Sequence, residues 1–267
     1  MAKVVRAVRP GLRSRTAPPW AGLSGALGNG PVRRVELKMA LDDSQDFTRL
    51  AGRLGLNAAK VNSLRVYFID DRGHTLRRHG MTIRLREYER SVELGLKLRN
   101  TSPIELPAGL HGLSGLSHEL DALPGRNQWS LALKNSQAKP RSCATSDGSW
   151  LDWCSPEQRQ FLAAVTRRQG HTRYDTSYGP IQVHRLDGSA AGLSRLVLER
   201  WRLPDGRQLL ELSTKCRSQD AKATARVMRD LVRRRRIAPS ARQRTKTEEF
   251  LQAWAPAGAT APSARAG

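Results

Sequence analysis

The chain has 267 residues, with 46 Lys and Arg against 24 Asp and Glu, which gives a formal net charge of +22 at pH 7. This length is enough to bury a real core, and the charge makes nucleic acid, anionic membrane surfaces and small polyphosphates candidate partners, because it attracts anions over roughly 8 to 10 Å. No apolar run approaches the roughly 18 residues of a membrane-spanning helix, and the three cysteines are too widely spaced for a zinc cluster or a disulfide framework.

Residues 1–30 are rich in Arg, Gly, Pro and Ala, which predicts a basic, disordered leader. The leader lacks the continuous apolar core of a secretory signal, while its composition also fits an organelle transit peptide. We favour the disordered leader. Because the cysteines suit a reducing compartment, we expect a cytoplasmic protein.

The folded region opens with RRVELKMAL, residues 33–41, in which apolar and mostly charged residues alternate. Successive side chains of a strand point to opposite faces, so the pattern predicts a strand with one apolar and one charged face. Asp42 and Asp43 follow, and we expect them to cap a helix in which Phe47 and Leu54 share one face.

Two further stretches predict strands before residue 100. Residues 64–70, LRVYFID, form a β-rich run that ends in the turn residues DDRG. Residues 81–99, MTIRLREYERSVELGLKLR, predict a hairpin with one aliphatic face and one mostly cationic face. The cationic face carries Arg84, Arg86, Lys97 and Arg99.

Residues 100–150 are a poorly defined insertion that is rich in Gly, Pro and Ser, with one strand-like stretch at 129–134. A helix is predicted after it, over residues 155–169. Ser155 is the expected N-cap of this helix, and Gln158 completes a capping box.

Three more strands are predicted at 180–187, 195–203 and 207–215. The last two are joined by PDG, which is typical of a hairpin turn. A helix capped by Ser218 follows and ends in the RRRR run at 233–236, whose charge suits a helix C-terminus. The remaining residues, 237–267, are predicted to form a low-complexity tail.

The predicted strands and helices alternate in blocks joined by hairpins, which indicates an α+β fold. Roughly eight antiparallel strands are enough to close a β-barrel, or tunnel, with the helices flanking it. We expect one domain over residues 31–236, between the leader and the tail.

Each predicted strand has an ordered charged face, which allows two interpretations. A half-buried sheet with its charged face in water shows this alternation, and for a single strand it is the commoner explanation. If the charged faces instead converge inside a barrel, they form a cationic cavity with few carboxylates. Such a cavity suits a polyphosphate anion, because Arg and Lys neutralise phosphate oxygens and carboxylates hold Mg²⁺ or Mn²⁺. The pattern over several strands favours the cavity.

Several stretches of the chain resemble the CYTH, or triphosphate tunnel metalloenzyme, superfamily. VELKM is similar to the opening Glu-any-Glu-any-Lys motif of that family, and VYFID, LRRHGMTIRLR and LGLK resemble the stretch that follows. TRYDTSYGPIQVHRLD and LLELSTK resemble the later strands. The resemblance covers roughly residues 33–99 and, more loosely, 171–232.

The resemblance implies a tunnel that binds a small anionic triphosphate or polyphosphate. It also implies metal-dependent hydrolysis of inorganic triphosphate, thiamine triphosphate or a nucleotide, while some members of the family make cyclic AMP. The implied phosphate ligands are Lys38, Arg84, Arg86, Lys97 and Arg173, with Arg99 beside them on the cationic face. The implied ligands of Mg²⁺ or Mn²⁺ are Glu36 and Glu211, with Asp187 as a weaker candidate.

Two positions depart from the family pattern: Arg34 and Ser213 stand where it carries Glu. The loss of acids weakens metal binding more than phosphate binding, and Glu93 and Glu199 are candidates to replace them. A non-catalytic polyphosphate- or nucleotide-binding module on the same fold therefore stays open. Nucleic-acid binding through the basic tails is a third alternative.

Overall fold

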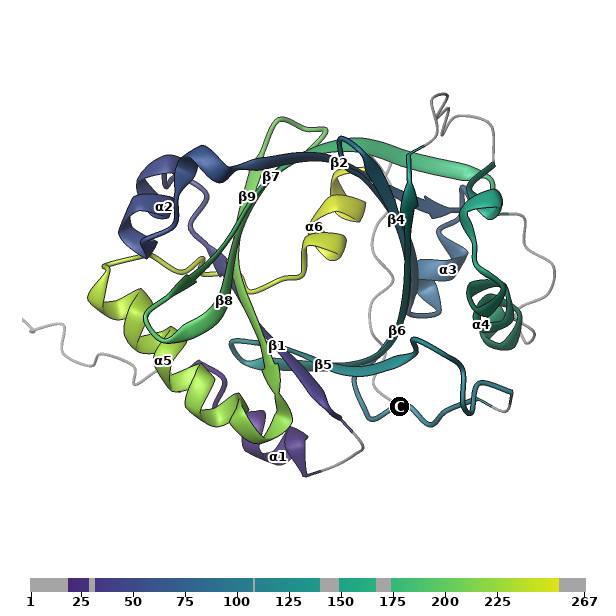
Figure 1. The fold of residues 1–267 in the computed structure, drawn as a ribbon, viewed down its shortest axis with the longest axis horizontal. Coiled ribbons are helices and arrows are strands. Elements are labelled where there is room, and N and C mark those ends of the chain that lie inside the picture. The colour runs from purple at the N-terminus through teal and green to yellow at the C-terminus, as the bar shows by residue number, and fades with distance from the viewer. Residues whose placement is uncertain (1–18, 29–31, 108, 140–148, 167–173, 255–267) are drawn as a thin grey trace, which may run out of the picture.

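The computed structural model of the chain describes residues 19–28, 32–107, 109–139, 149–166 and 174–254. Within them, nine strands close a barrel that helices flank (Figure 1). The strands are β1 (Arg34–Leu41), β2 (Asn62–Asp70), β3 (Met81–Glu87), β4 (Ser91–Asn100), β5 (Ser117–Leu123), β6 (Arg126–Ala138), β7 (Thr176–Ala190), β8 (Leu193–Arg202) and β9 (Gln208–Arg217). The helices are α1 (Leu23–Leu27), α2 (Phe47–Leu54), α3 (Thr75–Arg78), α4 (Pro156–Thr166), α5 (Ala221–Arg234) and α6 (Lys246–Ala253), with short 3₁₀ turns at Ala58–Lys60, Ser149–Trp153 and Ser218–Asp220.

The strands follow the order β1-β5-β6-β4-β3-β2-β7-β8-β9 around the barrel, and β9 pairs with β1 to close it. The closed α+β barrel with flanking helices confirms the predicted fold. The structure differs from the prediction in having nine described strands rather than eight, and in the parallel pairing of β1 with β5. The difference arises in the segment 100–150, where a Gly-, Pro- and Ser-rich stretch hides the short strand β5 from a search for long alternating runs.

Two apolar layers lie outside the barrel wall. One packs α1, α2 and α5 against the outward side chains of β1, β5, β8 and β9, and the other packs α3 and α4 against β3, β4 and β6 (Figure 1). The capping box expected at α4 is present, with Ser155 Oγ accepting from Gln158 N at 3.2 Å and Gln158 Oε1 accepting from Ser155 N at 3.1 Å. The cap of α2 is Asp46, which accepts from Arg49 N at 2.8 Å, and not Asp42 or Asp43.

The described part of the predicted leader packs on the barrel. Trp20 is buried, and its Nε1 donates to the carbonyl oxygen of Ala122 at 2.9 Å. Leu23 and Ala26 of α1 are buried in the same layer. The packed part of the chain therefore begins before the expected boundary at residue 30, because a few apolar residues among many polar ones are enough to anchor a short segment.

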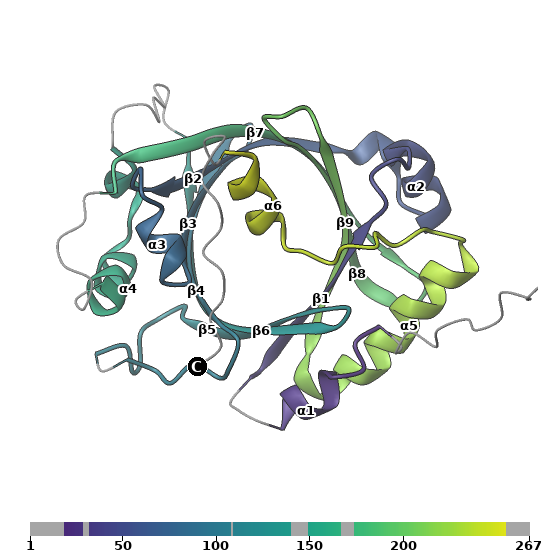
Figure 2. The ribbon, with the colours of Figure 1, turned by 180° about the vertical axis from the view of Figure 1, so that it is seen from behind.

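Helix α6 lies within the ring of strands (Figure 2). The prediction of a low-complexity tail over residues 237–267 is therefore wrong for this helix. A capping box starts it: Thr245 Oγ1 accepts from Glu248 N at 3.3 Å, and Glu248 Oε2 accepts from Thr245 N at 2.9 Å. Phe250 is fully buried and stacks on Phe68 with ring centroids 4.8 Å apart. The inward apolar side chains of β2, β7 and β8 need such a partner, so this end of the barrel is filled rather than hollow.

No helix among the described residues is both long and apolar enough to cross a membrane. The cytoplasmic location stays a prediction.

We expect Phe250→Ala to lower the free energy of unfolding by about 3 to 5 kcal/mol, because it empties a large aromatic site that the surrounding strands cannot refill. The measurement is urea-induced unfolding. Leu151→Ala, at a position that is 42% exposed, is the matched control and should change stability far less. Equal losses in both variants would show that α6 does not contribute to the core.

Candidate functional site

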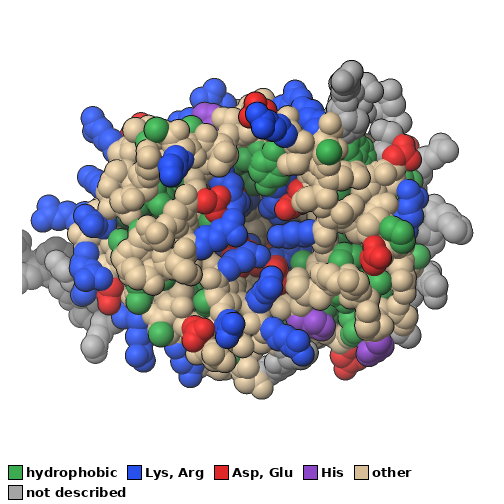
Figure 3. Space-filling model, viewed as in Figure 1, with side chains coloured by type: hydrophobic (Ala, Val, Ile, Leu, Met, Phe, Trp, Pro, Cys, Tyr) green, Lys and Arg blue, Asp and Glu red, His purple; other side chains and the backbone are tan. Residues whose placement is uncertain are grey.

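The part of the barrel that α6 leaves open contains a cavity of about 660 Å³. Figure 3 shows Lys and Arg side chains around a hollow in the middle of this face of the molecule. The charged lining is eleven cations, Arg34, Lys38, Arg84, Arg86, Lys97, Arg99, Lys134, Arg185, Arg195, Lys215 and Lys246, and five acids, Glu36, Glu93, Glu119, Asp187 and Glu199.

Strand alternation turns these side chains inward. In β1 the apolar residues at 35, 37 and 39 are buried in the outer layer, so the residues at 34, 36 and 38 face the cavity. Residues that are directly opposite on paired strands share a face. Arg86 of β3 is directly opposite Val66 of β2, so both side chains lie on the inner face of the barrel. The cationic part of the interior therefore borders the apolar part at this strand pair.

Three carboxylates gather on the β1–β5 side of the cavity. One oxygen each of Glu36, Glu119 and Asp121 lies within 4.8 Å of the others. Three lysines pair with them. Lys38 Nζ lies 3.2 Å from Glu36 and 3.2 Å from Asp121, Lys97 Nζ lies 2.7 Å from Asp121 and 3.1 Å from Glu119, and Lys215 Nζ lies 3.0 Å from Glu119. We call these six residues the acid–lysine cluster.

The cluster keeps its acids ionised. Burial alone would raise the pKa of Glu36, but Lys38, Lys215 and Lys97 hold it well below its usual range. Burial likewise opposes ionisation of Asp121, and Lys38 and Lys97 reverse that effect and lower its pKa. The same pairing raises the pKa of Lys38 against the effect of burial. All three side chains are therefore charged at neutral pH.

Arg84 has no ion pair among the described residues. Burial lowers its pKa to about 9, and the charges of Arg86 and Arg99 add to the effect. Its neighbour Arg86 is paired with Glu93. A partly buried guanidinium without an anion is costly, so Arg84 is a position in the cavity where an incoming anion is stabilised, as is Lys134, which also has no ion pair among the described residues.

A second ion-pair group joins residues of β7, β8 and β9 to the start of α6. Lys246 pairs with Glu199 and lies 2.6 Å from Glu211, and Arg185 lies 2.6 Å from both Glu199 and Asp187. Glu199 and Glu211 are buried. The predicted metal ligands therefore do not lie together. Glu36 is in the acid–lysine cluster, whereas Glu211, Asp187 and Glu199 are in this second group.

The structure brings most of the predicted site residues to one cavity. Lys38, Arg84, Arg86, Lys97, Arg99, Glu36, Asp187, Glu93 and Glu199 all line it. Glu211 reaches the cavity through its contact with Lys246. Arg173 lies outside the described residues. Ser213 and Arg34, the two departures from the family pattern, also line the cavity.

Sequence reasoning missed Glu119, Asp121 and Lys246. The first two alternate with Leu120 and Ala122 in β5, which is a real but short signal inside the poorly defined insertion. Lys246 follows a capping residue in the predicted tail. Its Thr-any-any-Glu pattern, Thr245 to Glu248, could have indicated a helix there.

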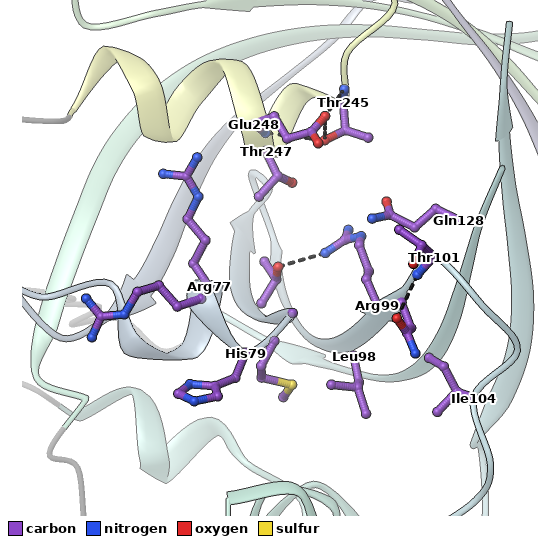
Figure 4. A pocket seen from close by; sticks show the side chains of 15 residues that line it. Arg77, His79, Leu98, Arg99, Thr101, Ile104, Gln128, Thr245, Thr247 and Glu248 are labelled. Atoms are coloured by element: carbon purple, nitrogen blue, oxygen red, sulfur yellow. Dashed lines mark hydrogen bonds between the residues drawn. The ribbon is translucent and has the colours of Figure 1, made fainter. Parts of the chain in front are cut away.

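A second cavity of about 640 Å³ lies beside α6, between α3 and the ends of β3, β4 and β6 (Figure 4). Arg99 lines both cavities and donates to Thr82 Oγ1 at 2.7 Å. In Figure 4 the side chain of Arg99 extends between Thr247 of α6 and Gln128 of β6. Arg99 thus forms part of the wall between the two spaces.

No family model matches the chain, and no curated protein matches it in sequence. Solved structures do share its fold. A candidate adenylyl cyclase from Hippeastrum, described with a dominant triphosphatase activity, matches with a TM-score of 0.54 at 14% identity over 83% of this chain and 96% of its own. A candidate adenylate cyclase from Bacillus halodurans matches with a TM-score of 0.53 at 14% identity over 82% and 97%. The likeness confirms the barrel fold that the CYTH resemblance implied.

The buried acids predict a specific dependence of stability on pH. Burial opposes ionisation of Glu199, but Lys246 and Arg185 lower its pKa well below its usual range. An unfolded Glu has a pKa of about 4.3, so the unfolded chain takes up this proton first as the pH falls. The free energy of unfolding should therefore decrease below about pH 4.

Glu199→Gln removes this proton uptake. We expect the variant to be less stable at pH 7, by about 1 to 3 kcal/mol, because Lys246 and Arg185 lose a charged partner. Its stability should also fall less steeply below pH 4 in urea unfolding. Glu89→Gln, in the exposed turn between β3 and β4, is the control. If the stability of Glu199→Gln fell with pH as steeply as that of the wild type, Glu199 would not be a source of the acid sensitivity.

Proposed function

We propose that the chain is a divergent CYTH protein that binds a triphosphate in the barrel cavity and hydrolyses it with the help of Mg²⁺ or Mn²⁺. The observation that supports this most directly is Arg84, a partly buried cation without an ion pair among the described residues, in a cavity whose lining has eleven cations and five acids. The shared fold with a Hippeastrum protein described as having triphosphatase activity is consistent with it.

The acid–lysine cluster fits a divalent metal ion by its chemistry. Mg²⁺ and Mn²⁺ prefer carboxylate oxygens, and three carboxylates offer oxygens within 4.8 Å of one another. Both side-chain oxygens of Asp121 are buried, and their partners are the ammonium groups of Lys38 at 3.2 Å and Lys97 at 2.7 Å. Glu36, Glu119 and Asp121 would hold the ion, which would neutralise charge on the phosphate oxygens.

The lysines explain how the cluster could take a metal and an anion together. Lys38, Lys97 and Lys215 balance the three acids when neither ligand is bound. A lysine ammonium sits on a flexible stem, so each can turn from a carboxylate to a phosphate oxygen when a metal ion takes its place. Lysine–carboxylate pairs would then be replaced by metal–carboxylate and lysine–phosphate pairs, so each charged group would keep a partner.

The arginines supply the part of the chemistry that needs fixed geometry. Guanidinium groups bind phosphate oxygens in pairs of hydrogen bonds, and Arg84 and Arg86 are adjacent on the inward face of β3. In hydrolysis, a water molecule attacks the terminal phosphorus of the triphosphate. The P–O bond between this phosphorus and the bridging oxygen breaks, and orthophosphate and diphosphate are released. Positioning and neutralising the developing charge provide most of the catalysis in such a reaction.

A non-catalytic binding module on the same fold is the second candidate function. It is favoured by Arg34 and Ser213, which line the cavity in place of acids, and by the three lysines that already occupy the acids of the cluster. Nucleic-acid binding rests mostly on the two tails, which lie largely outside the described residues, and stays a prediction.

Arg84→Gln should weaken binding of tripolyphosphate by about 10- to 100-fold, the usual cost of losing a charge-assisted hydrogen bond. Titration calorimetry without metal measures this directly. Arg49→Gln, on the exposed face of α2, is the matched control and should bind as the wild type does. Absence of tripolyphosphate binding by the wild type would overturn the proposal.

Glu119→Gln separates catalysis from binding. We expect it to abolish phosphate release from tripolyphosphate, thiamine triphosphate or ATP with Mg²⁺ or Mn²⁺, and to keep metal-free tripolyphosphate binding within about tenfold of the wild type. Thermal unfolding shows whether the variant is folded. Tight binding by the wild type with no phosphate release in either metal would favour the non-catalytic module.

A further inference from the structure

The mouth of the cavity carries two like charges side by side. Arg34 of β1 is directly opposite Arg217 of β9 in the antiparallel register. Opposed side chains share a face at about 5 Å between Cβ atoms, and like charges in these positions destabilise a sheet. Two residues further in, Glu36 is opposite Lys215, which is a pair of opposite charges. The charges on β1 and β9 are therefore balanced inside the barrel but not at its mouth. Neither Arg34 nor Arg217 has an ion pair among the described residues.

These arginines line a third cavity of about 560 Å³ that adjoins the first. The two cavities share Arg34, Arg195, Thr214 and Lys215 in their linings, so the space inside the barrel continues outward between β1, β8 and β9. We call Arg34, Arg195 and Arg217 the arginine rim. Asp220 is the one acid among the described residues that line this outer cavity.

The rim lies beyond the residues that a triphosphate would contact. The acid–lysine cluster and Arg84 are inside the barrel, whereas Arg34 and Arg217 are exposed at its edge. A ligand that contacts both the inner cations and the arginine rim must carry negative charge along its length and extend from the cavity out through its mouth. The outer cavity has no aromatic side chain among its described lining residues, so it offers no platform on which a nucleic-acid base could stack.

We propose that the arginine rim binds the emerging part of a linear inorganic polyphosphate, so that the preferred ligand is a chain of more than three phosphates whose end enters the cavity. This inference rests on the proposed function, because the end of the chain occupies the triphosphate site. It also gives a role to the charge reversal at Arg34, which continues the cationic path past the cluster.

The test is calorimetry in metal-free buffer with tripolyphosphate, tetrapolyphosphate and longer linear polyphosphate. The wild type should bind the longer chains about tenfold more tightly than tripolyphosphate, since each exposed arginine contributes a modest ion pair. In Arg217→Gln, at a rim position that does not line the main cavity, tripolyphosphate binding should be unchanged and the gain with length should be largely lost. The control is Arg226→Gln on the exposed face of α5, which removes the same charge elsewhere.

A second measurement does not depend on any ligand. Because Arg34 and Arg217 repel each other, Arg217→Gln should be at least as stable as the wild type in urea unfolding, and a lower stability would contradict a ligand-binding role for the pair. This also shows that a loss of length preference does not come from unfolding.

The outcomes distinguish the rim from the site. If the wild type binds tripolyphosphate but shows no preference for longer chains, or if Arg217→Gln keeps the full preference, the rim proposal is wrong and the proposed function stands. If the wild type does not bind tripolyphosphate, both are wrong. A 5′-triphosphorylated oligonucleotide is the remaining probe: if the rim favours it over polyphosphate, the occupant is a nucleic acid and the polyphosphate assignment fails.

Discussion

The interior of this barrel depends on the pairing of buried charge. Ionised groups cannot be taken out of water singly without a large cost, and the acid–lysine cluster meets this condition with three carboxylates and three lysines that contact one another at 2.7 to 3.2 Å in their closest pairs. The second group, around Lys246, meets it in the same way. Arg84, which is partly buried in the same cavity, has no ion pair among the described residues, and the proposed anion would supply the missing partner.

The cavity exists because the interior is divided. Phe250 and the apolar side chains of β2, β7 and β8 fill one part of the barrel, and the charged side chains occupy the rest. Lys246, at the start of α6, stands where the two parts meet and contacts the acids of β8 and β9. A single short helix thus supplies both the apolar filling and one of the charges that balance the acids.

The sequence was informative wherever a strand was long and alternated strictly. Residues of β1, β3 and β4 could be placed on an inward cationic face because every second residue is aliphatic and buried in the outer layers. β5 could not be found in this way, because only Leu120 and Ala122 mark its apolar face and loop-forming residues precede it. Glu119 and Asp121 were missed for that reason. Pairing between distant strands, which joins Glu36 to Asp121, leaves no local pattern at all.

The pairing of β1 has a consequence for how the chain is made. β1 lies between β5 and β9, so residues 34–41 find their last partner at residues 208–217. Contacts of such large sequence separation form slowly. During synthesis the first strand leaves the ribosome early and must wait, with its apolar outer face uncovered, until nearly the whole barrel has emerged. Exposed apolar strands are prone to aggregate, so the outer face of β1 is vulnerable for as long as its partner strands are missing.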